Sequence, residues 1–353
     1  MGYLHKMKHF VGGRIIKTGI AVFITALICE ALEWPAMFAV IAAIVTIEPS
    51  AADSIKKAIV RFPASGIGAL YAILFYMSFG DNPLTYTLVA LATIITCHKL
   101  RLDAGILVAT LTGVAMITTV HDHYLSSFLI RLGTTFTGLT VSTLVNLLVL
   151  KPNYTPAISE KIKILLKETG ELMETSGAEL VKGKHDAKPK QARQTLHKIV
   201  RDVERIEDLC RYQREELKYH RFKRKDLRLF YYENKKLKIL TQLTYHVGNL
   251  MFIPSHKRIA DPEKGAIILA TVRSMNEILK DERHTVSEAH QRLIDRLFEE
   301  FSEKALSPSE TDYHHLTTET VIFYELVAIH DLLEELEKTA CIALKKEKAL
   351  EIS

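Results

Sequence analysis

Six apolar stretches follow one another in the first 150 residues of the chain. They cover residues 18–32, 34–47, 62–80, 82–97, 104–120 and 132–150, and Glu30 is the only charged residue inside them. A helix that crosses the roughly 30 Å hydrocarbon core of a bilayer needs about 20 such residues. About 11% of the residues in this part are charged, against about 34% of those that follow. The contrast predicts a membrane-spanning first part and a water-soluble second part. It excludes a single globular enzyme domain, a disordered chain and a secreted disulfide scaffold.

Lys and Arg residues indicate how often the chain crosses the membrane, because they stay on the cytoplasmic side of the spans that they flank. Basic residues precede the first stretch and follow the second, fourth and sixth, whereas the loops at 81–83 and 121–123 contain none. The first two stretches therefore form a hairpin that turns at residues 33–35, rather than one long helix over 18–47. We predict six transmembrane helices in the cell membrane, with both termini cytoplasmic. The flanking basic residues are Lys6, Lys8, Arg14, Lys17, Lys56, Lys57, Arg61, Lys99, Arg101 and Lys151.

The second part of the chain has the apolar spacing of helices. From Thr155 onward, apolar residues recur at steps of three and four along one face. Further periodic stretches follow at about 196–213, 232–252, 263–281, 285–305 and 311–346. No alternating run of useful length indicates a β-strand. We predict an all-α protein in which a six-helix transmembrane bundle at 1–153 precedes a cytoplasmic antiparallel helical bundle at 154–353.

Polar residues of the last apolar stretch are candidates for binding an organic anion. Arg131 lies about six residues into this span, where a charge is costly unless it reaches the interface, pairs with a group such as Glu30, or faces an aqueous cavity. Asn146 lies deep in the same span and needs a partner helix or water. A cation beside hydroxyl groups suits an organic anion. We therefore predict Arg131, Asn146 and Thr135 as substrate-binding residues.

A second set of candidates lies at the cytoplasmic end of the spans. Glu48 ends the second stretch, where it can pair with Arg61 or Lys17. A carboxyl group at this interface suits proton coupling, because partial burial raises the pKa of a carboxyl group. We predict that Glu48, Lys17 and Arg61 serve proton coupling or gating.

Small residues are frequent in the apolar stretches, and in lipid they let helix backbones approach closely. We predict that Gly66, Gly68, Gly133 and Gly138 serve helix packing. An alternative interpretation is that hydroxyl groups of the last span line a polar path. These groups belong to Thr134, Thr135, Thr137, Thr140, Ser142 and Thr143.

Sequence motifs for catalysis are absent: there is no phosphate loop, dinucleotide turn, kinase signature, GxSxG or HExxH motif. The histidine pairs at 121 and 123 and at 314 and 315 have no further ligand at metal spacing except Asp122, and the four cysteines are widely separated. The net charge of +5 provides no concentrated basic face for nucleic acid. A basic run at 220–225 is either a solvated helix face or a contact for anionic lipid headgroups. We predict no enzymatic activity, no cofactor, no metal and no nucleic-acid partner.

Several motifs of the first part recur in one known family. They are Arg14-x-x-Lys17-Thr18-Gly19-x-Ala21, Glu48-Pro49-Ser50, Arg61 followed by Gly66-x-Gly68-Ala69, Arg131-x-Gly133 through Gly138 to Asn146, and Lys151-Pro152-Asn153-Tyr154. Over about residues 10–154 the chain resembles the aromatic acid exporter family, which is related to the fusaric acid resistance proteins. The rest resembles the cytoplasmic helical domain of the short members from Gram-positive bacteria.

The resemblance implies an efflux permease of the cytoplasmic membrane for aromatic carboxylates or similar organic anions. Larger relatives carry two membrane modules, so a homodimer or a higher homo-oligomer would supply the half that this chain lacks. Because no ATP-binding motif is present, active transport would use an ion gradient or another chain. The alternative function is a membrane-anchored interaction or regulatory module without transport activity, and six spans rich in small residues exceed what an anchor needs.

Overall fold

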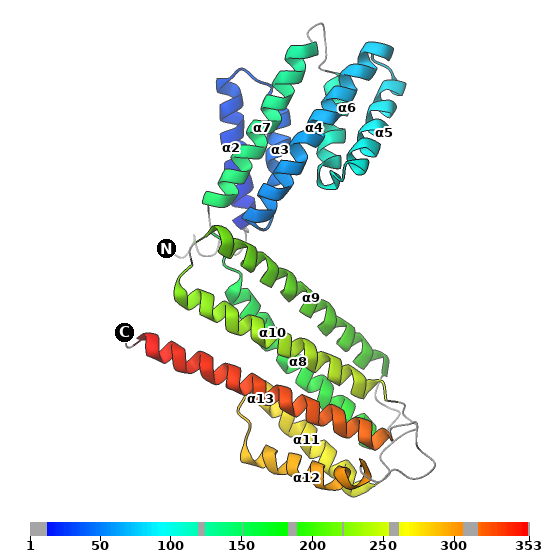
Figure 1. Ribbon diagram of the computed structural model, residues 1–353, viewed down its shortest axis with the longest axis vertical. Coiled ribbons are helices and arrows are strands. Elements are labelled where there is room, and N and C mark those ends of the chain that lie inside the picture. Colours follow the sequence, from blue (N-terminus) through cyan, green and yellow to red (C-terminus); the bar gives the residue numbers. More distant parts are fainter. Residues whose placement is uncertain are drawn as a thin grey trace. The chain divides into compact units, whose positions relative to one another are not determined.

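The computed structural model describes residues 13–118, 124–149, 151–182, 189–220, 222–253, 261–305 and 317–351 (Figure 1). Twelve α-helices and one 3₁₀ turn lie within these ranges, and none of the described residues forms a β-strand. The predicted all-α class is thereby confirmed for this part of the chain. The chain divides into two compact units, of which the first comprises Met1–Asn153 with Tyr212–Arg221, and the second Tyr154–Arg211 with Phe222–Ser353.

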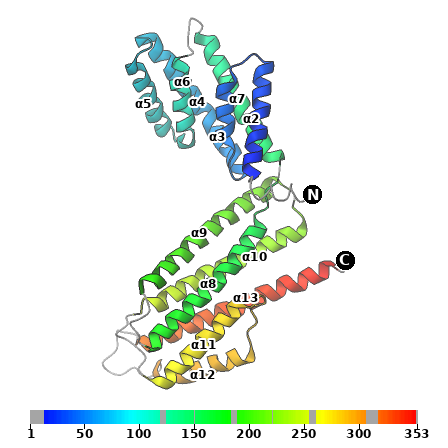
Figure 2. The same ribbon diagram turned by 180° about the vertical axis from the view of Figure 1, so that it is seen from behind.

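The first unit contains six α-helices between residues 13 and 148. They are α2 (Gly13–Ala31), α3 (Ala36–Thr46), α4 (Ala51–Phe79), α5 (Pro83–Lys99), α6 (Ile106–Ile117) and α7 (Tyr124–Leu148), and the 3₁₀ turn η1 (Asp103–Gly105) precedes α6. Figures 1 and 2 show α2, α3, α4 and α7 running alongside one another, with α5 and α6 beside α4. The chain turns between α2 and α3, so a single helix over 18–47 does not form.

Local interactions explain where two of these helices begin and end. Glu33 adopts the left-handed conformation with a φ of 55°, and the amide of Trp34 donates to the carbonyl of Cys29 at 2.8 Å, which closes α2. The hydroxyl of Ser50 accepts a hydrogen bond of 3.0 Å from the amide of Asp53. This is the usual N-cap of a helix, and it fixes the start of α4.

Two helices, α4 and α7, are long and apolar enough to cross a membrane by length and composition. The α3 helix and the segment Asp103–Ile117 are shorter apolar helices. The α2 helix has 19 residues, but Arg14, Lys17 and Glu30 make it more charged than a typical span. The structure thus supports two membrane-crossing helices, and the full set of six crossings stays a prediction.

The first unit has apolar side chains outside and many polar side chains inside. Phe23, Leu107 and Phe136 are 68%, 62% and 58% exposed. Conversely, many hydroxyl side chains are fully buried, including Thr25, Thr46, Ser54, Ser65, Thr85, Thr93, Thr134 and Ser142. Soluble proteins keep their large apolar side chains inside. The outer surface of this unit therefore suits a surrounding of lipid.

Glycines bring the helices of the first unit close together. A Cβ added at Gly68 would collide with the carbonyl oxygen of Ala109, where α4 crosses α6, and one added at Gly138 would collide with that of Ala39, where α7 crosses α3. At Gly133 it would lie 2.6 Å from the indole ring of Trp34. Gly66 differs, because a Cβ there would only make an ordinary contact of 3.5 Å with Leu132.

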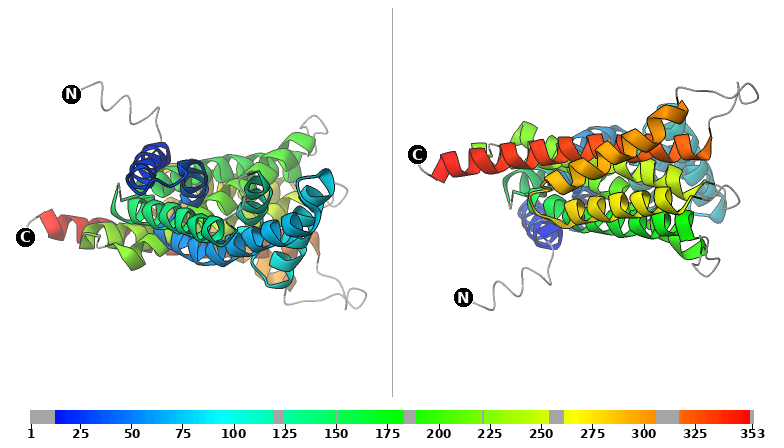
Figure 3. Two further views of the ribbon diagram at one scale, coloured as in Figure 1. Left: turned by 90° about the horizontal axis from the view of Figure 1, so that it is seen from above. Right: turned by 90° about the horizontal axis from the view of Figure 1, so that it is seen from below.

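The second unit is built from long amphipathic helices. These are α8 (Thr155–Lys182), α9 (Pro189–Tyr219), α10 (Arg224–Met251), α11 (Pro262–Lys280), α12 (Glu288–Ala305) and α13 (Thr318–Glu351), with α9 grouped with the first unit from Tyr212 onward. The α8, α9 and α10 helices lie side by side in Figures 1 and 2, and α12 packs against α11 and α13 (Figure 3). Their buried faces form a core that includes Ile162, Leu240, Leu243, Met275 and Leu333.

Helix boundaries in this unit differ from the predicted ones, and α9 extends beyond the predicted stretch at 196–213 on both sides. The α10 helix begins at Arg224, about two turns before the predicted stretch at 232–252, because its first turns are amphipathic rather than apolar. The basic run at 220–225 is not one helix face, since α9 ends at Tyr219 and α10 begins only after the extended Lys223.

Candidate functional site

Arg131 is buried inside the first unit and keeps unused hydrogen-bond donors. Its side chain, on α7, is 6% exposed, and its Nη2 donates to the hydroxyl of Thr112 on α6 at 2.7 Å. The guanidinium carbon lies 3.5 Å from the centre of the Phe38 ring on α3, which is a cation–π contact. Nε and Nη1 have no hydrogen-bond partner among the described residues. A buried cation with two free N–H groups can bind an anion.

Hydroxyl groups connect Arg131 to Thr135. The hydroxyl of Ser65 on α4 donates to that of Thr112 at 3.3 Å and lies 3.1 Å from that of Thr135. The network therefore joins α4, α6 and α7 around the guanidinium group. Two of the three predicted substrate-binding residues, Arg131 and Thr135, lie in one network.

Asn146, the third predicted binding residue, lies in a different place. It is 15 residues beyond Arg131 on α7, which corresponds to about 22 Å along a helix axis. Its Nδ2 donates to the hydroxyl of Ser54 at 2.7 Å and to the carbonyl of Glu48 at 3.1 Å, and its Oδ1 accepts from Lys17 at 2.9 Å. With these partners its amide is occupied, so Asn146 ties α7 to α2 and to the start of α4.

The three predicted coupling residues meet around Asn146. Oε1 of Glu48 lies 3.1 Å from Nη2 of Arg61, and its Oε2 lies 2.9 Å from Nζ of Lys57. Arg61 also donates to the carbonyls of Val45 and Ala104, at 3.1 and 3.2 Å. Lys17 does not contact Glu48 directly. It joins the cluster through Asn146, whose side chain also bonds the Glu48 carbonyl.

A buried carboxylate from the second half of the sequence completes this cluster. Glu216 belongs to the segment Tyr212–Arg221 of the first unit, is fully buried, and accepts a hydrogen bond of 2.7 Å from the amide of Ala51. The carboxylate thus lies at the N-terminus of α4, where the helix dipole favours a negative charge. Nε2 of His220 donates to the carbonyl of Leu147 at 2.7 Å. Sequence reasoning missed Glu216, which looks like any solvated carboxylate of a charged helix, and placed His220 only in the basic run at 220–225.

Two predicted arrangements are not formed by the described residues. Glu30 is exposed and makes no ion pair with Arg131, whose contacts are instead Thr112 and Phe38. Nor does Arg131 reach outward to the interface, because its side chain is buried.

Hydroxyl groups of α7 bond largely within their own helix rather than lining a continuous path. Thr134 bonds the carbonyl of Arg131 at 2.9 Å, Thr137 that of Gly133 at 2.9 Å, and Ser142 that of Gly138 at 2.7 Å. Thr140 and Thr143 line an apolar groove of about 440 Å³ between α4 and α7.

Metal binding finds no support in the described residues. No group of three or more His, Cys, Asp or Glu side chains there could hold a metal ion. The residues at 121, 123, 314 and 315 lie outside the described part of the chain.

Two compact helical units, the first with an apolar exterior, a buried cation and two candidate membrane spans, are typical of a helical membrane protein with a second helical unit. Residues 9–149 match the model of the family described as "Aromatic acid exporter family member 1". UPF0421 proteins match the chain over nearly their full length. One from Bacillus cereus (strain ATCC 10987) is 43% identical over 334 residues, which are 94% of each chain. One from Oceanobacillus iheyensis is 39% identical over 98% of this chain and 99% of its own, and one from Staphylococcus haemolyticus is 37% identical over 91% and 96%.

The chain belongs to the UPF0421 family, and its first part is an aromatic acid exporter family domain. This domain and the two candidate membrane helices indicate a location in the membrane. The domain also favours a transporter rather than an enzyme.

Proposed function

We propose that this protein is an efflux permease of the cell membrane for aromatic carboxylates or similar organic anions. All six helices α2–α7 cross the bilayer, and both termini are cytoplasmic. The observation that carries the proposal is Arg131, a buried cation without a carboxylate partner and with two unused N–H groups. A charge inside a membrane unit is costly and is therefore a marker of function.

Arg131 attracts the carboxylate of the cargo by its charge and donates to it from Nε or Nη1, the two nitrogens without a partner among the described residues. Thr112 holds the guanidinium group in place, and Thr135 and Ser65 supply further hydroxyl groups beside it. The ring of Phe38 covers the guanidinium and offers an apolar face to the ring of the cargo.

The cluster around Glu48 forms the gate at the cytoplasmic end of the unit. Glu48, Arg61 and Lys57 link α3 to α4, while Lys17 and Asn146 link α2 to α7. These helices can move relative to one another only if the ion pairs and the amide contacts break together. Protonation of Glu48 would release Arg61 and Lys57, the two cations that it pairs with. An ion gradient therefore drives transport, and the chain works as a homodimer or higher homo-oligomer in the lipid bilayer.

A flux assay in proteoliposomes tests the transport function. Purified protein should move labelled benzoate under an imposed proton or sodium gradient, and Arg131→Gln should reduce the flux at least tenfold. Arg131→Lys should restore part of it, because it keeps the charge but not the planar guanidinium group with its several donors. Arg101→Gln, at an exposed position, is the matched control. Equal flux in wild type and Arg131→Gln would rule out this role of Arg131, and no flux for any aromatic acid would rule out the transporter.

Cysteine labelling in intact cells tests the six crossings separately. In a Cys341→Ala background, Asp81→Cys should react with a membrane-impermeant maleimide. Ser353→Cys should react only after the cells are permeabilised. Labelling of Ser353→Cys in intact cells would overturn the topology.

The alternative function, a membrane-anchored interaction or regulatory module, is favoured by the separate core of the second unit. Truncation after Tyr154 distinguishes the two functions. Transport retained by the truncated chain would limit the second unit to regulation or assembly. Absence of transport by the intact chain, together with loss of a bound cytosolic protein on truncation, would favour the module.

A further inference from the structure

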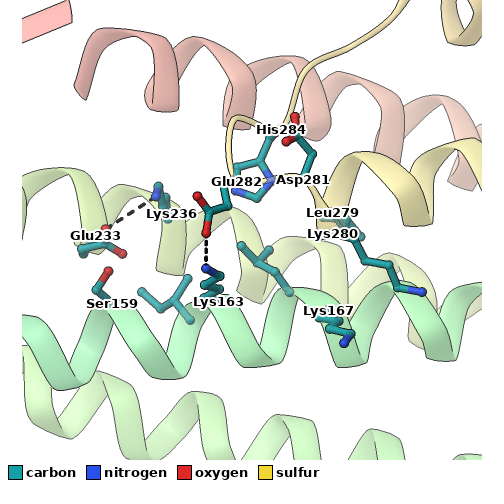
Figure 4. A pocket seen from close by; sticks show the side chains of 12 residues that line it. Ser159, Lys163, Lys167, Glu233, Lys236, Leu279, Lys280, Asp281, Glu282 and His284 are labelled. Atoms are coloured by element: carbon teal, nitrogen blue, oxygen red, sulfur yellow. Dashed lines mark hydrogen bonds and ion pairs between the residues drawn. The ribbon is translucent and has the colours of Figure 1, made fainter. Parts of the chain in front are cut away.

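A pocket of about 250 Å³ lies in the second unit between α8, α10 and the turn after α11 (Figure 4). Its apolar lining comes from Ile162 and Leu166 of α8 and Leu279 of α11, which are 1%, 2% and 3% exposed. An engineered cavity of about 150 Å³ lined by Leu, Ile and Phe holds benzene. The pocket therefore has the size for one six-membered ring that carries one small polar group.

Lysines surround this apolar lining, and their donors are incompletely used. Lys236 lies 3.5 Å from Glu233, and Lys280 lies 3.6 Å from Glu171, both beyond the length of an ordinary N–H···O bond. Lys167 has no hydrogen bond or ion pair to any described residue. In Figure 4, Lys236 lies beside Glu233 at one end of the pocket, and Lys167 and Lys280 lie at the other end, beyond Lys163 and Glu282.

The carboxylates of the lining have partners other than Lys167. Glu282 pairs with Lys163 across the pocket, between the turn and α8, and this contact raises the pKa of Lys163 (Figure 4). Asp281 accepts a hydrogen bond of 3.1 Å from the amide of Thr285, which lowers the pKa of Asp281. Among the charged side chains of the lining, Lys167 is the one whose charge is uncompensated.

The turn that closes the pocket is held in a defined shape. His284 is 5% exposed and adopts the left-handed conformation with a φ of 53°. Its Nδ1 donates to the carbonyl of Ile278 at 3.0 Å, and burial lowers its pKa, so its imidazole is neutral at pH 7. Because His284 anchors the turn, the pocket is formed before a ligand arrives.

We propose that this pocket binds a small organic monoanion with an apolar ring, of which benzoate is the simplest representative. The ring lies against Leu166 and Leu279, and the carboxylate bonds Lys167. This site is separate from Arg131, and binding there does not require transport. That the ligand belongs to the same class as the cargo, so that the second unit senses it, rests on the proposed function.

Equilibrium dialysis of radiolabelled benzoate against the full chain in detergent tests the proposal. The assay is performed in an Arg131→Gln background, so that the first unit does not contribute. One saturable site is expected. Lys167→Gln should raise the dissociation constant about tenfold, which corresponds to about 1.4 kcal/mol. Ser159→Phe, which fills the pocket from α8, should abolish binding, and Lys161→Gln, an exposed lysine on the same helix outside the lining, should leave it unchanged.

Competing ligands define the class. Benzylammonium should not compete because its charge is reversed, and acetate and inorganic phosphate should compete at least tenfold more weakly because they lack the ring. Each variant is accepted only if its thermal unfolding, followed by circular dichroism, matches that of Lys161→Gln. Lys167→Gln keeps the test valid even where Ser159→Phe fails to fold, since Lys167 has no partner to lose.

Three results would overturn the proposal. The first is the absence of saturable benzoate binding in the Arg131→Gln background. The second is binding that Lys167→Gln leaves unchanged. The third is competition by benzylammonium or phosphate as strong as that by benzoate. If Arg131→Gln abolishes transport and no benzoate binds in that background, the pocket is refuted and the permease is supported. If benzoate binds but the wild-type protein transports nothing, the pocket is supported and the permease is refuted.

Discussion

The two units of this protein are both helical bundles, but their polar and apolar side chains are arranged in opposite ways. In the first, Lys17, Arg61 and Arg131 are 5–6% exposed while apolar side chains such as that of Phe23 cover the outside. In the second, aliphatic residues such as Leu240 fill the core while charged groups face outward. Lipid offers helices no hydrophobic reason to associate, so the first unit depends on close backbone approach and internal hydrogen bonds. The second depends on apolar burial in water.

Buried polar groups therefore differ in meaning between the two units. In the second unit, the buried Glu325 contacts Nδ1 of His246 at 2.6 Å and accepts a hydrogen bond from Nδ2 of Asn249 at 2.9 Å. Its carboxylate is satisfied, as expected of a structural group. Arg131 retains two unsatisfied donors in a unit full of hydroxyl groups. Arg131 is therefore a candidate binding residue because its hydrogen-bond donors lack partners, and not merely because its charge is buried.

The largest expected effect comes from introducing a polar group into the aliphatic core. Leu240→Asn should lower the free energy of unfolding of the second unit by about 3–5 kcal/mol, because the amide finds no partner at a fully buried site. The measurement is thermal unfolding in detergent by circular dichroism. Leu227→Asn, on the same helix and 39% exposed, should change stability by less than about 1 kcal/mol. Equal effects at both positions would show that this core does not hold the unit together.

The next largest effect concerns backbone contact in the first unit. Gly138→Ala should destabilise this unit by roughly 2–3 kcal/mol, because the new methyl group would collide with the carbonyl of Ala39 and force α7 away from α3. Gly19→Ala is the control on α2, where a Cβ meets nothing within 4 Å and alanine is the better helix former. Unfolding by denaturant in mixed micelles measures both. An unchanged Gly138→Ala variant would argue against close helix contact as the basis of this unit.

A buried histidine makes the second unit sensitive to acid. His290 is fully buried, with Nδ1 3.0 Å from the hydroxyl of Ser274 and Nε2 3.2 Å from Nδ1 of His330. Burial, and to a lesser extent the charge of a protonated His330, lowers the pKa of His290 to about 4. The unfolded chain, with a histidine pKa near 6.5, binds the proton first. Stability is therefore complete above pH 6.5 and declines towards pH 4, by about 2 kcal/mol between pH 7 and 5.

Comparison of variants isolates this contribution. His290→Gln should flatten the decline of stability between pH 6.5 and 5, whereas the exposed His197→Gln should keep the wild-type profile. Hydrogen bonds from the Thr285 amide and the Lys338 side chain lower the pKa values of Asp281 and Glu334. The stability that these two carboxylates contribute to the fold is therefore lost only at lower pH than that of His290. A decline that persists in His290→Gln would assign the sensitivity to another group.

The sequence predicts helices and their breaks well where a local cause exists. The turn before α3 follows from residues at 33–35, which act over a few residues. The α4 helix, in contrast, begins at Ala51, well before the predicted apolar stretch at 62–80, because the Ser50 cap lies in a charged segment that the hydropathy pattern passes over. The start of α10 was placed too late, because most side chains between Arg224 and Leu229 are exposed and form no distinct apolar stripe. Periodicity detects a helix by its buried face, so it misses turns that bury little.

The candidate site was predictable as a set of unusual residues but not as an arrangement. Charged or amide groups in or next to the apolar spans identified Arg131, Asn146 and Glu48. The pairing of Glu48 with Arg61 was among the predicted ones, but the partners of Arg131 and Asn146 were not predicted. The placement of Asn146 with Lys17 depends on how α7 faces α2, and Glu216 reaches Ala51 across 165 positions of sequence. Contacts between distant segments depend on tertiary packing, which no local pattern contains.

The smallest expected effect completes the contrast between the units, because it removes an arginine from a water-facing helix rather than from a buried site. Arg205 lies 2.8 Å from Asp202 one turn away on α9, and its side chain is 73% exposed. Water and salt screen such a pair, so Arg205→Ala should lower the free energy of unfolding by at most about 0.5 kcal/mol and by less at 1 M salt. A double-mutant cycle with Asp202→Ala measures the pair itself. A coupling above about 1 kcal/mol that persists in salt would mean that this surface is shielded from water, and the assignment of a water-facing second unit would then fail.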